Sequence, residues 1–581
     1  MDRTTQSESG LFAAYNGALN APYYGIYDPA GPLGYNIETD ATRGPGATGS
    51  NLVWRSDTRV NETRIKSKKL LGSFYGELEP ISGLKYRLTL GADLNVGNGT
   101  FFQEAADFGN EQRRSLLVQE RPIELTTNLT QTLTYKKSFG KHDFTVLVGH
   151  EETNFEFNKM RIQGGGLFNS NVQLPAVATT VAAANEADHW ALRGYLARLF
   201  YSFDDKYLFT FNMRRDETSR FASNNRSGIF PSLSAGWRVS DEPFMKNQKL
   251  FSSLKLRGSW GESGNQFTGQ NFAYLPSLAT TVFYVIGSGQ SILRGPAPVV
   301  FANSNLKWER SAQTDIGFDA TLLNGKLDVN FDYYNKVTND VLLSLPIPFS
   351  SGYFLPADAN LGKIKNTGIE LSALYRGRAG DFRYSIGGNI TTVKNKVLSL
   401  GDIKEIVTGT GGASTHRTTV GNPLGYFYGF KTNGIYQNDK EVAAAVPDAF
   451  SAGAEPGDLR FVDVNGDGVV DASDRTYIGK SIPDFYYGIN LTLAWKNFDL
   501  SMFIQGVGGT QLYNAAGQAL ESMTSGSNQL KTVLNRWKGE GTSNTIPRAI
   551  QSDPNGNNRY SDRWIENGSF ARFKNLQLGY T

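Results

Sequence analysis

The sequence contains no cysteine. This absence excludes a disulfide-stapled scaffold, a thiolate metal site and a cysteine nucleophile. An excess of charge of one sign is also missing, since 58 lysines and arginines stand against 55 aspartates and glutamates. Because no long basic run occurs either, nucleic acid is not expected as a partner.

Long apolar runs are absent as well. No stretch approaches the roughly 18 apolar residues of a membrane-crossing helix, and the mean hydropathy is −0.36. The start, Met1 to Thr5, has no apolar segment of the signal-peptide kind. A transmembrane β-barrel remains compatible with these absences, because lipid-facing and lumen-facing residues alternate along each strand and cancel in a window average.

Aromatic residues (12%) and glycine (63 residues) are abundant, as aromatic girdles and glycine-rich loops would require. Apolar and polar residues alternate along 315–322 and again along 327–336, and Asn324-Gly325 between them predicts a two-residue hairpin turn. Alternation of this kind predicts about fifteen strands. They lie near 65–78, 84–95, 124–136, 142–155, 191–203, 207–215, 231–239, 253–260, 315–322, 327–336, 366–376, 382–396, 489–495, 498–504 and 570–581.

The links between these strands alternate strictly between short and long. The short links include 79–83, 204–206 and Lys496-Asn497, whereas the long ones include 156–190 and 397–484. An outer-membrane barrel has this pattern, with short periplasmic turns and long extracellular loops. We therefore predict an all-β, antiparallel transmembrane barrel in the outer membrane, in contact with outer-membrane lipid.

Several strings then resemble the SusC/RagA family of TonB-linked outer-membrane transporters. They are "LKLRGSWGESGNQ" from Leu254, "NLKWERSAQTDIGFD" from Asn305, "NTGIELS" from Asn366, "GDLRFVDVNGDGVVDASDRTYIG" from Gly457 and "FARFKNLQLGYT" from Phe570. The resemblance implies a barrel of roughly 22 strands around a plug. It also implies a SusD-like lipoprotein partner, energy from TonB–ExbB–ExbD, and an oligosaccharide or peptide as the imported solute.

The sequence lacks the TonB box, the plug and the last strands of that family. We therefore expect a barrel fragment, in which residues 1–60 form an extracellular loop region between strands and 61–581 form a partial barrel. The TonB contact would then be made through a plug outside this chain. A passive porin or scaffold barrel, and a secreted calcium-binding adhesin, remain alternatives.

Within the long loop 397–484, residues 463–474 match a calcium-binding loop. Acidic and amide side chains alternate at the spacing that an oxygen-ligated cation needs, and Gly468 allows the sharp turn. We predict a structural Ca²⁺ ligated by Asp463, Asn465, Asp467, the Val469 carbonyl, Asp471 and Asp474. The alternative is a solvated turn rich in aspartate and asparagine.

No enzyme is expected. The four histidines are scattered, and no G-x-S-x-G nucleophile motif occurs.

Overall fold

The computed structural model describes residues 2–5, 25–29, 31–36, 51–107, 112–168, 171–268, 270–298, 301–345, 350, 357–409, 415–524 and 528–580. Most of the predicted loop region 1–60 lies outside these residues.

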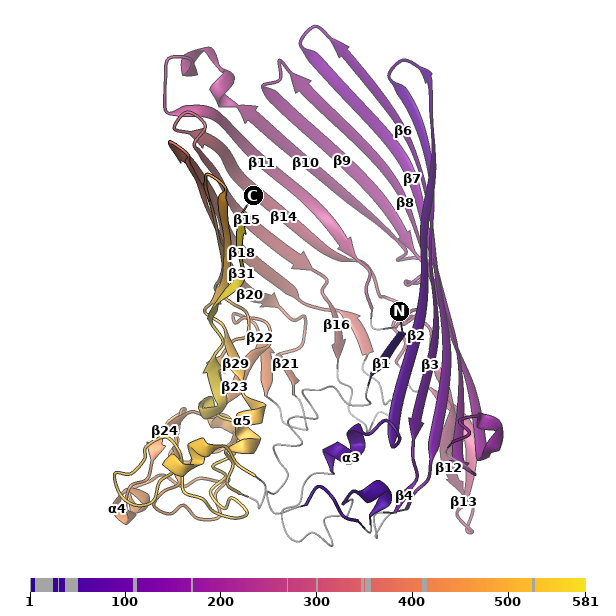
Figure 1. Ribbon diagram of the computed structural model, residues 1–581, viewed down its shortest axis with the longest axis vertical. Helices are drawn as coiled ribbons and strands as arrows, with labels where there is room; N and C mark the ends of the chain where they lie inside the picture. Colours follow the sequence, from indigo (N-terminus) through magenta and orange to yellow (C-terminus); the bar gives the residue numbers. More distant parts are fainter. Residues whose placement is uncertain are drawn as a thin grey trace.

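One antiparallel sheet of 17 strands forms the body of the molecule (Figure 1). Fifteen of its strands form one ladder in chain order, in which each pairs with the next, and this confirms the predicted strand ladder. They are β2 (Asn61–Ile81), β3 (Leu84–Gln103), β6 (Leu116–Phe139), β7 (His142–Leu167), β8 (Ala178–Phe203), β9 (Tyr207–Thr218), β10 (Ser227–Arg238), β11 (Phe251–Asn265), β14 (Glu309–Leu322), β15 (Leu327–Asn339), β18 (Lys363–Ala379), β19 (Phe382–Thr392), β27 (Phe485–Trp495), β28 (Phe498–Gly508) and β31 (Phe570–Tyr580).

Two short strands complete this sheet. β1 (Asp2–Thr5) pairs with β2, so part of the range 1–60 joins the sheet. β20 (Lys394–Ser399) continues β19 after a break at Val393 and pairs with the long-loop end of β18. Figure 1 shows the sheet curving from β2, with the short β1 beside it, at one margin to β31 at the other. Among the described residues, no pairing joins β31 to β1 or β2.

The two faces of the sheet separate by polarity, as the alternation predicts. On one face, Arg257 of β11 donates hydrogen bonds to Asp319 of β14 and to Asp332 of β15. On the other face, Ile316 of β14 is 63% exposed, as a lipid-facing side chain is once the lipid is removed. The polar face is therefore the lumen side of the wall.

Both hairpin turns lie where they are predicted, but the turn at Asn324-Gly325 is longer than predicted. Lys496-Asn497 is a two-residue turn, because Trp495 pairs directly with Phe498. At Asn324-Gly325 the turn has four residues, because Leu322 pairs with Leu327. The backbone of Leu323 and Asn324 lies at φ 56, and that of Gly325 at φ 84, a region that glycine occupies without steric cost.

Several strands extend well beyond the alternating stretches. The link expected over 156–190 contains only residues 168–177, because β7 and β8 remain paired far past the expected membrane zone. Residues 182–188 of β8 mix alanine with polar side chains on both faces. Apolar and polar residues no longer alternate where neither face of a strand contacts lipid. The sequence therefore did not predict the extended parts of β7 and β8.

Small elements gather on the long-loop side of the sheet, which lies at the bottom of Figure 1. The helices are α3 (Leu52–Ser56), α4 (Asp439–Ala443) and α5 (Ala515–Leu520). The strands include β12 (Leu278–Ile286) with β13 (Ser291–Pro298), β16 (Leu342–Leu345) with β17 (Ala357–Asn360), β24 (Thr432–Ile435) with β25 (Leu459–Phe461), β29 (Gln511–Tyr513) with β30 (Ile565–Asn567), and the sheet of β21 (Glu405–Thr408), β22 (His416–Thr419), β23 (Tyr426–Gly429) and β26 (Thr476–Gly479).

In the part of the chain that the structure describes, no helix is long and apolar enough to cross a membrane.

Candidate functional site: the extracellular body and the lumen wall

Two long loops, 400–484 and 509–569, fold against each other into one body beside the wall. The core of this body contains aromatic and aliphatic side chains from the first loop, with Trp537 of the second packed against them. The buried members are Phe430, Ile435, Leu459, Phe461 and Val470. We call this unit the extracellular body, after the side of the membrane predicted for the long loops.

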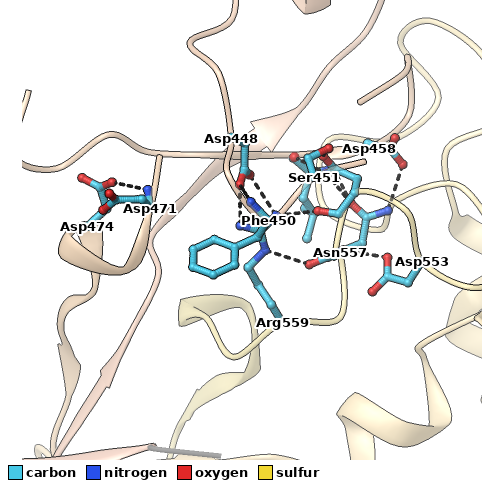
Figure 2. Close-up of polar contacts among 12 residues, drawn as sticks. Asp448, Phe450, Ser451, Asp458, Asp471, Asp474, Asp553, Asn557 and Arg559 are labelled. Carbon is cyan, nitrogen blue, oxygen red and sulfur yellow. Dashed lines mark hydrogen bonds and ion pairs between the residues drawn. The ribbon is translucent and has the colours of Figure 1, made fainter. Parts of the chain in front are cut away.

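An ion pair joins the two loops beside this core. Arg559 of the second loop donates two hydrogen bonds to Asp448 of the first, at 3.1 and 2.8 Å (Figure 2). The guanidinium also lies over the Phe461 ring, 3.8 Å from its centroid. Both charged side chains are nearly buried, so this bidentate ion pair joins the two loops at a defined position.

A second buried pair lies close by in the same body. Asp458 is fully buried and accepts hydrogen bonds from Arg548 at 3.0 and 3.1 Å. Asn557 donates a third bond to Asp458 at 2.9 Å (Figure 2). A buried carboxylate that is satisfied in this way stabilises the fold only while all its partners remain.

The predicted calcium loop lies at the edge of this body and is closed by its own side chains. Asp463 accepts from the backbone amides of Gly466 and Gly468, at 2.7 and 2.8 Å. Asp474, which is fully buried, accepts from the amides of Val464, Asn465 and Asp471. Gly468 lies at φ 90, so the turn expected at this glycine is present.

Asp474 and Asp463 also contact each other. Although burial alone would raise the pKa of Asp474, the three backbone amides and the Asp463 carboxyl hold it below its ordinary value.

Two other predicted ligands, Asp467 and Asp471, accept hydrogen bonds from the loop backbone. Asp467 accepts from the amide of Val469, and Asp471 accepts from the amide of Ser473, where it caps the 3-10 turn Ala472–Asp474. Within the described ranges, no three His, Cys, Asp or Glu side chains are gathered in a group that could hold a metal. A cation would therefore require Asp467 and Asp471 to turn inward.

The loop is connected to the ion pair between the two long loops. Val470 donates its amide hydrogen to the carbonyl of Pro447, and its own carbonyl accepts from Ala449, on either side of Asp448. Sequence spacing could not have found Asp448, Asp458, Arg548 or Arg559, because the paired residues are 90 or more positions apart and lie in stretches without periodicity.

Unsatisfied polar groups gather in one short segment of the second loop. Burial lowers the pKa of Arg563 to about 10, and this side chain lies 4.2 Å above the Trp564 ring. No hydrogen-bond partner among the described residues reaches the buried atoms Asn558 Oδ1, Tyr560 Oη, Ser561 Oγ, Arg563 Nη2 and Trp564 Nε1. Residues 558–564 therefore retain unused hydrogen-bonding capacity.

Comparison with known proteins agrees with this architecture. Residues 5–581 match the family model described as TonB dependent receptor-like, beta-barrel. TonB-dependent receptor P3 of Formosa agariphila is 31% identical over 96% of this chain and 55% of its own length. TonB-dependent receptor SusC of Bacteroides thetaiotaomicron is 30% identical over 86% of this chain and 48% of its own.

Solved structures show the same fold. The structure of the RagAB peptide transporter superposes with a TM-score of 0.78 at 23% identity, over 92% of this chain and 57% of the other. The chain spans about half the length of the curated relatives it matches. The match confirms the resemblance to the SusC/RagA transporters, the outer-membrane location and the expectation of a protein that is not an enzyme. The chain belongs to the TonB-dependent receptor β-barrel family.

Proposed function

We propose that the protein imports a large solute, an oligosaccharide or a peptide, across the outer membrane with energy from TonB–ExbB–ExbD. The proposal rests on the match to the TonB-dependent receptor family, which extends from residue 5 to residue 581. The polar lumen face, with the Arg257 pairs to Asp319 and Asp332, supports passage of a hydrophilic solute.

A SusD-like surface lipoprotein is the proposed partner. Two relatives support this proposal. The RagAB peptide transporter has the same fold over the matching part of its chain, and SusC has a related sequence there. The extracellular body, held together by the Arg559 and Arg548 pairs, offers a rigid surface on the side where such a lipoprotein would sit. Purification of the tagged full-length transporter from outer membranes should retain a lipoprotein in stoichiometric amount.

Deletion of the tonB gene distinguishes active import from passive diffusion through a porin. Uptake of the cognate solute by cells that carry the transporter should stop when the tonB gene is deleted. A passive porin would continue to admit the solute in those cells, and a scaffold barrel would admit none in either strain. Either of those results would refute active import.

We also propose that the loop 463–474 binds Ca²⁺ and so orders the extracellular body. The ligand spacing in the sequence supports this proposal. Titration of the purified protein with Ca²⁺ should give binding at a dissociation constant of roughly 10⁻⁴–10⁻³ M, the range of extracellular sites. Asp467→Asn should weaken that binding, and Asp439→Asn in α4 should leave it unchanged. Absence of binding in the unmodified protein would favour the solvated turn.

A further inference from the structure

Four lysines stand together at the long-loop end of β18 and β20. They are Lys363, Lys365, Lys394 and Lys396, and we call them the lysine cluster. Lys365 pairs directly with Lys396, and Thr367 with Lys394, and directly opposite residues of two strands share one face of the sheet. Three of the four lysines are exposed and Lys365 is half-buried.

The lysine cluster lies on the outer face of the wall, opposite the lumen. Side chains of one face recur at every second residue of a strand, so Lys363 and Lys365 share the face of Ile369. Ile369 pairs with Tyr333, and Tyr333 pairs with the lipid-facing Ile316. A plug in the lumen would lie on the other face, and β18 and β19 are each paired on both sides. The surroundings of the cluster therefore do not depend on a plug.

Along the wall, the lysine cluster begins where the apolar band ends. Residues 382–392 of β19 extend about 33 Å, at roughly 3.3 Å per residue. For a strand tilted by about 40°, this length corresponds to about 25 Å of depth, which is the height of the lipid-facing band of an outer-membrane barrel. Lys394 and Lys396 follow directly and so lie at the level of the lipid headgroups.

No carboxylate among the described residues forms an ion pair with the lysine cluster. On β15, the outer positions opposite this end of β18 are Asn335, Val337 and Asn339, which are neutral. Asp484, whose carbonyl accepts the amide hydrogen of Val393, is itself paired with Lys480. Four positive charges therefore share one patch without an internal counter-ion.

Other cations on this outer face do have such a counter-ion. Arg310 stands at the level of Lys363, since both pair with Asn339, and its guanidinium lies 3.7 Å from Glu262. Two further outer arginines are also paired, Arg193 with Glu152 and Arg215 with Glu217. The lysine cluster differs from these sites because its charge is left for a partner outside the chain.

An apolar groove of about 560 Å³ lies on the same face, deeper in the lipid zone. Ala373 and Gly388, which pair directly, form its floor. The larger side chains around it are Leu371, Ile390, Phe485, Tyr487 and Ile489. The two rings lie over Gly508 and Gly506 of β28, so the space above Gly388 remains open. We call this feature the outer groove; its polarity suits an acyl chain.

The distance between the lysine cluster and the outer groove suits a single lipid molecule. Gly388 lies about 20 Å along the strand from Lys394. This length corresponds to about 15 Å of depth at the same tilt. Half of the hydrocarbon core is also about 15 Å thick. An acyl chain whose headgroup contacts the lysines would therefore reach the groove.

A phosphorylated headgroup fits the lysine cluster better than a second copy of this chain does. In a two-fold dimer across this face the same patch of both subunits meets itself, so lysines would face lysines and repel. Phosphate oxygens instead accept charge-assisted hydrogen bonds from ammonium groups.

We propose that the lysine cluster and the outer groove together bind one phosphorylated glycolipid of the outer leaflet. Its phosphates contact the four lysines, and one of its acyl chains occupies the groove. The site depends on the outer-membrane location and not on import, since it faces away from the lumen.

The test measures lipid binding by the full-length transporter with its co-purified lipoprotein, after removal of bound lipid with detergent. The probes are lipid A and lipid A from which both phosphates have been removed. The unmodified protein should bind the phosphorylated form about tenfold more tightly or better, because several lysines act on it together. Equal binding of the two forms would overturn the proposal.

A variant without the lysine cluster tests the headgroup contact. Changing all four lysines to glutamine (Lys363→Gln, Lys365→Gln, Lys394→Gln and Lys396→Gln) should abolish the preference for the phosphorylated form. The control removes the same charge from exposed lysines at the short-turn end, by Lys136→Gln, Lys137→Gln, Lys326→Gln and Lys496→Gln. It should change the preference less than about twofold. A preference that survives in the first variant, or is lost equally in both, would refute the headgroup site.

Gly388→Leu tests the groove. A Cβ atom at this position would contact only the Gly488 carbonyl oxygen, at 3.7 Å, so the leucine fills the groove without a clash. It should weaken binding of both forms of the lipid about fivefold. Gly72→Leu, on the outer face of β2 with no atom within 4 Å of its Cβ, should change binding less than about twofold. Equal heat-modified mobility on gels will show that all variants are folded. Unchanged binding by Gly388→Leu would refute the acyl-chain contact.

Discussion

At the scale of single residues, the buried charges of the extracellular body are the most consequential. Arg559 and Asp448 are only 11% and 13% exposed, so each depends on the other for its charge to be tolerated. Removing one member of such a pair leaves a buried charge without compensation.

Arg559→Met should therefore lower the local stability of the body by about 3 kcal/mol. Hydrogen exchange of the amides of Asp448, Ala449 and 555–559 would measure the loss. Arg460→Met provides the control, since Arg460 lies 3.9 Å from Glu441 and both are more than a third exposed. It should cost less than about 1 kcal/mol. Equal effects of the two substitutions would contradict the structural role of the Arg559 pair.

At the scale of one strand, an added charge should destabilise the lipid face of β14 much more than its lumen face. Ile316 is on the lipid side, whereas Gln313 is on the lumen side and bonds to Asp315. Ile316→Lys should reduce the free energy of unfolding in lipid vesicles by roughly 2–4 kcal/mol. Gln313→Lys should reduce it far less, because the lumen hydrates the new charge. Urea titration followed by tryptophan fluorescence would compare the two, and a similar loss in both would show that the faces are misassigned.

The turn after β14 can be tested in the same way. Gly325→Val places a β-branched residue at φ 84 and should cost about 1–3 kcal/mol. Gly72→Ala in β2 is a suitable control, since a Cβ there meets no atom within 4 Å. Urea midpoints in detergent should separate the two variants. If Gly325→Val unfolds at the same midpoint as the unmodified protein, the four-residue turn is wrong.

At the scale of the whole molecule, the calcium loop and the second long loop should respond to Ca²⁺ together. The backbone bonds of Val470 to Pro447 and Ala449 connect the loop to Asp448, and Asp448 holds Arg559. Adding Ca²⁺ should slow hydrogen exchange in 463–474 and also in 553–559. In Arg559→Met the first effect should remain and the second should vanish. Protection confined to 463–474 in the unmodified protein would mean that the loops are not coupled.

Alternation along the chain was sufficient to predict the strands, the lumen and lipid faces and the short turns such as Lys496-Asn497. This is possible because each long strand pairs with its neighbour along the chain, so the topology follows directly from strand order. The spacing of 463–474 likewise predicted a tightly turned loop, although its cation remains a proposal.

Only the tertiary structure revealed the Arg559–Asp448 and Arg548–Asp458 pairs, which join loops without any periodic pattern. It also revealed which lumen side chains of neighbouring strands meet, such as Arg257, Asp319 and Asp332. Such groupings depend on the register between strands and on loop packing. Alternation excludes a one-residue shift in register, because that shift would move every lumen side chain to the lipid face, but it does not distinguish shifts of two residues. The packing of the loops has no periodic pattern that could predict it.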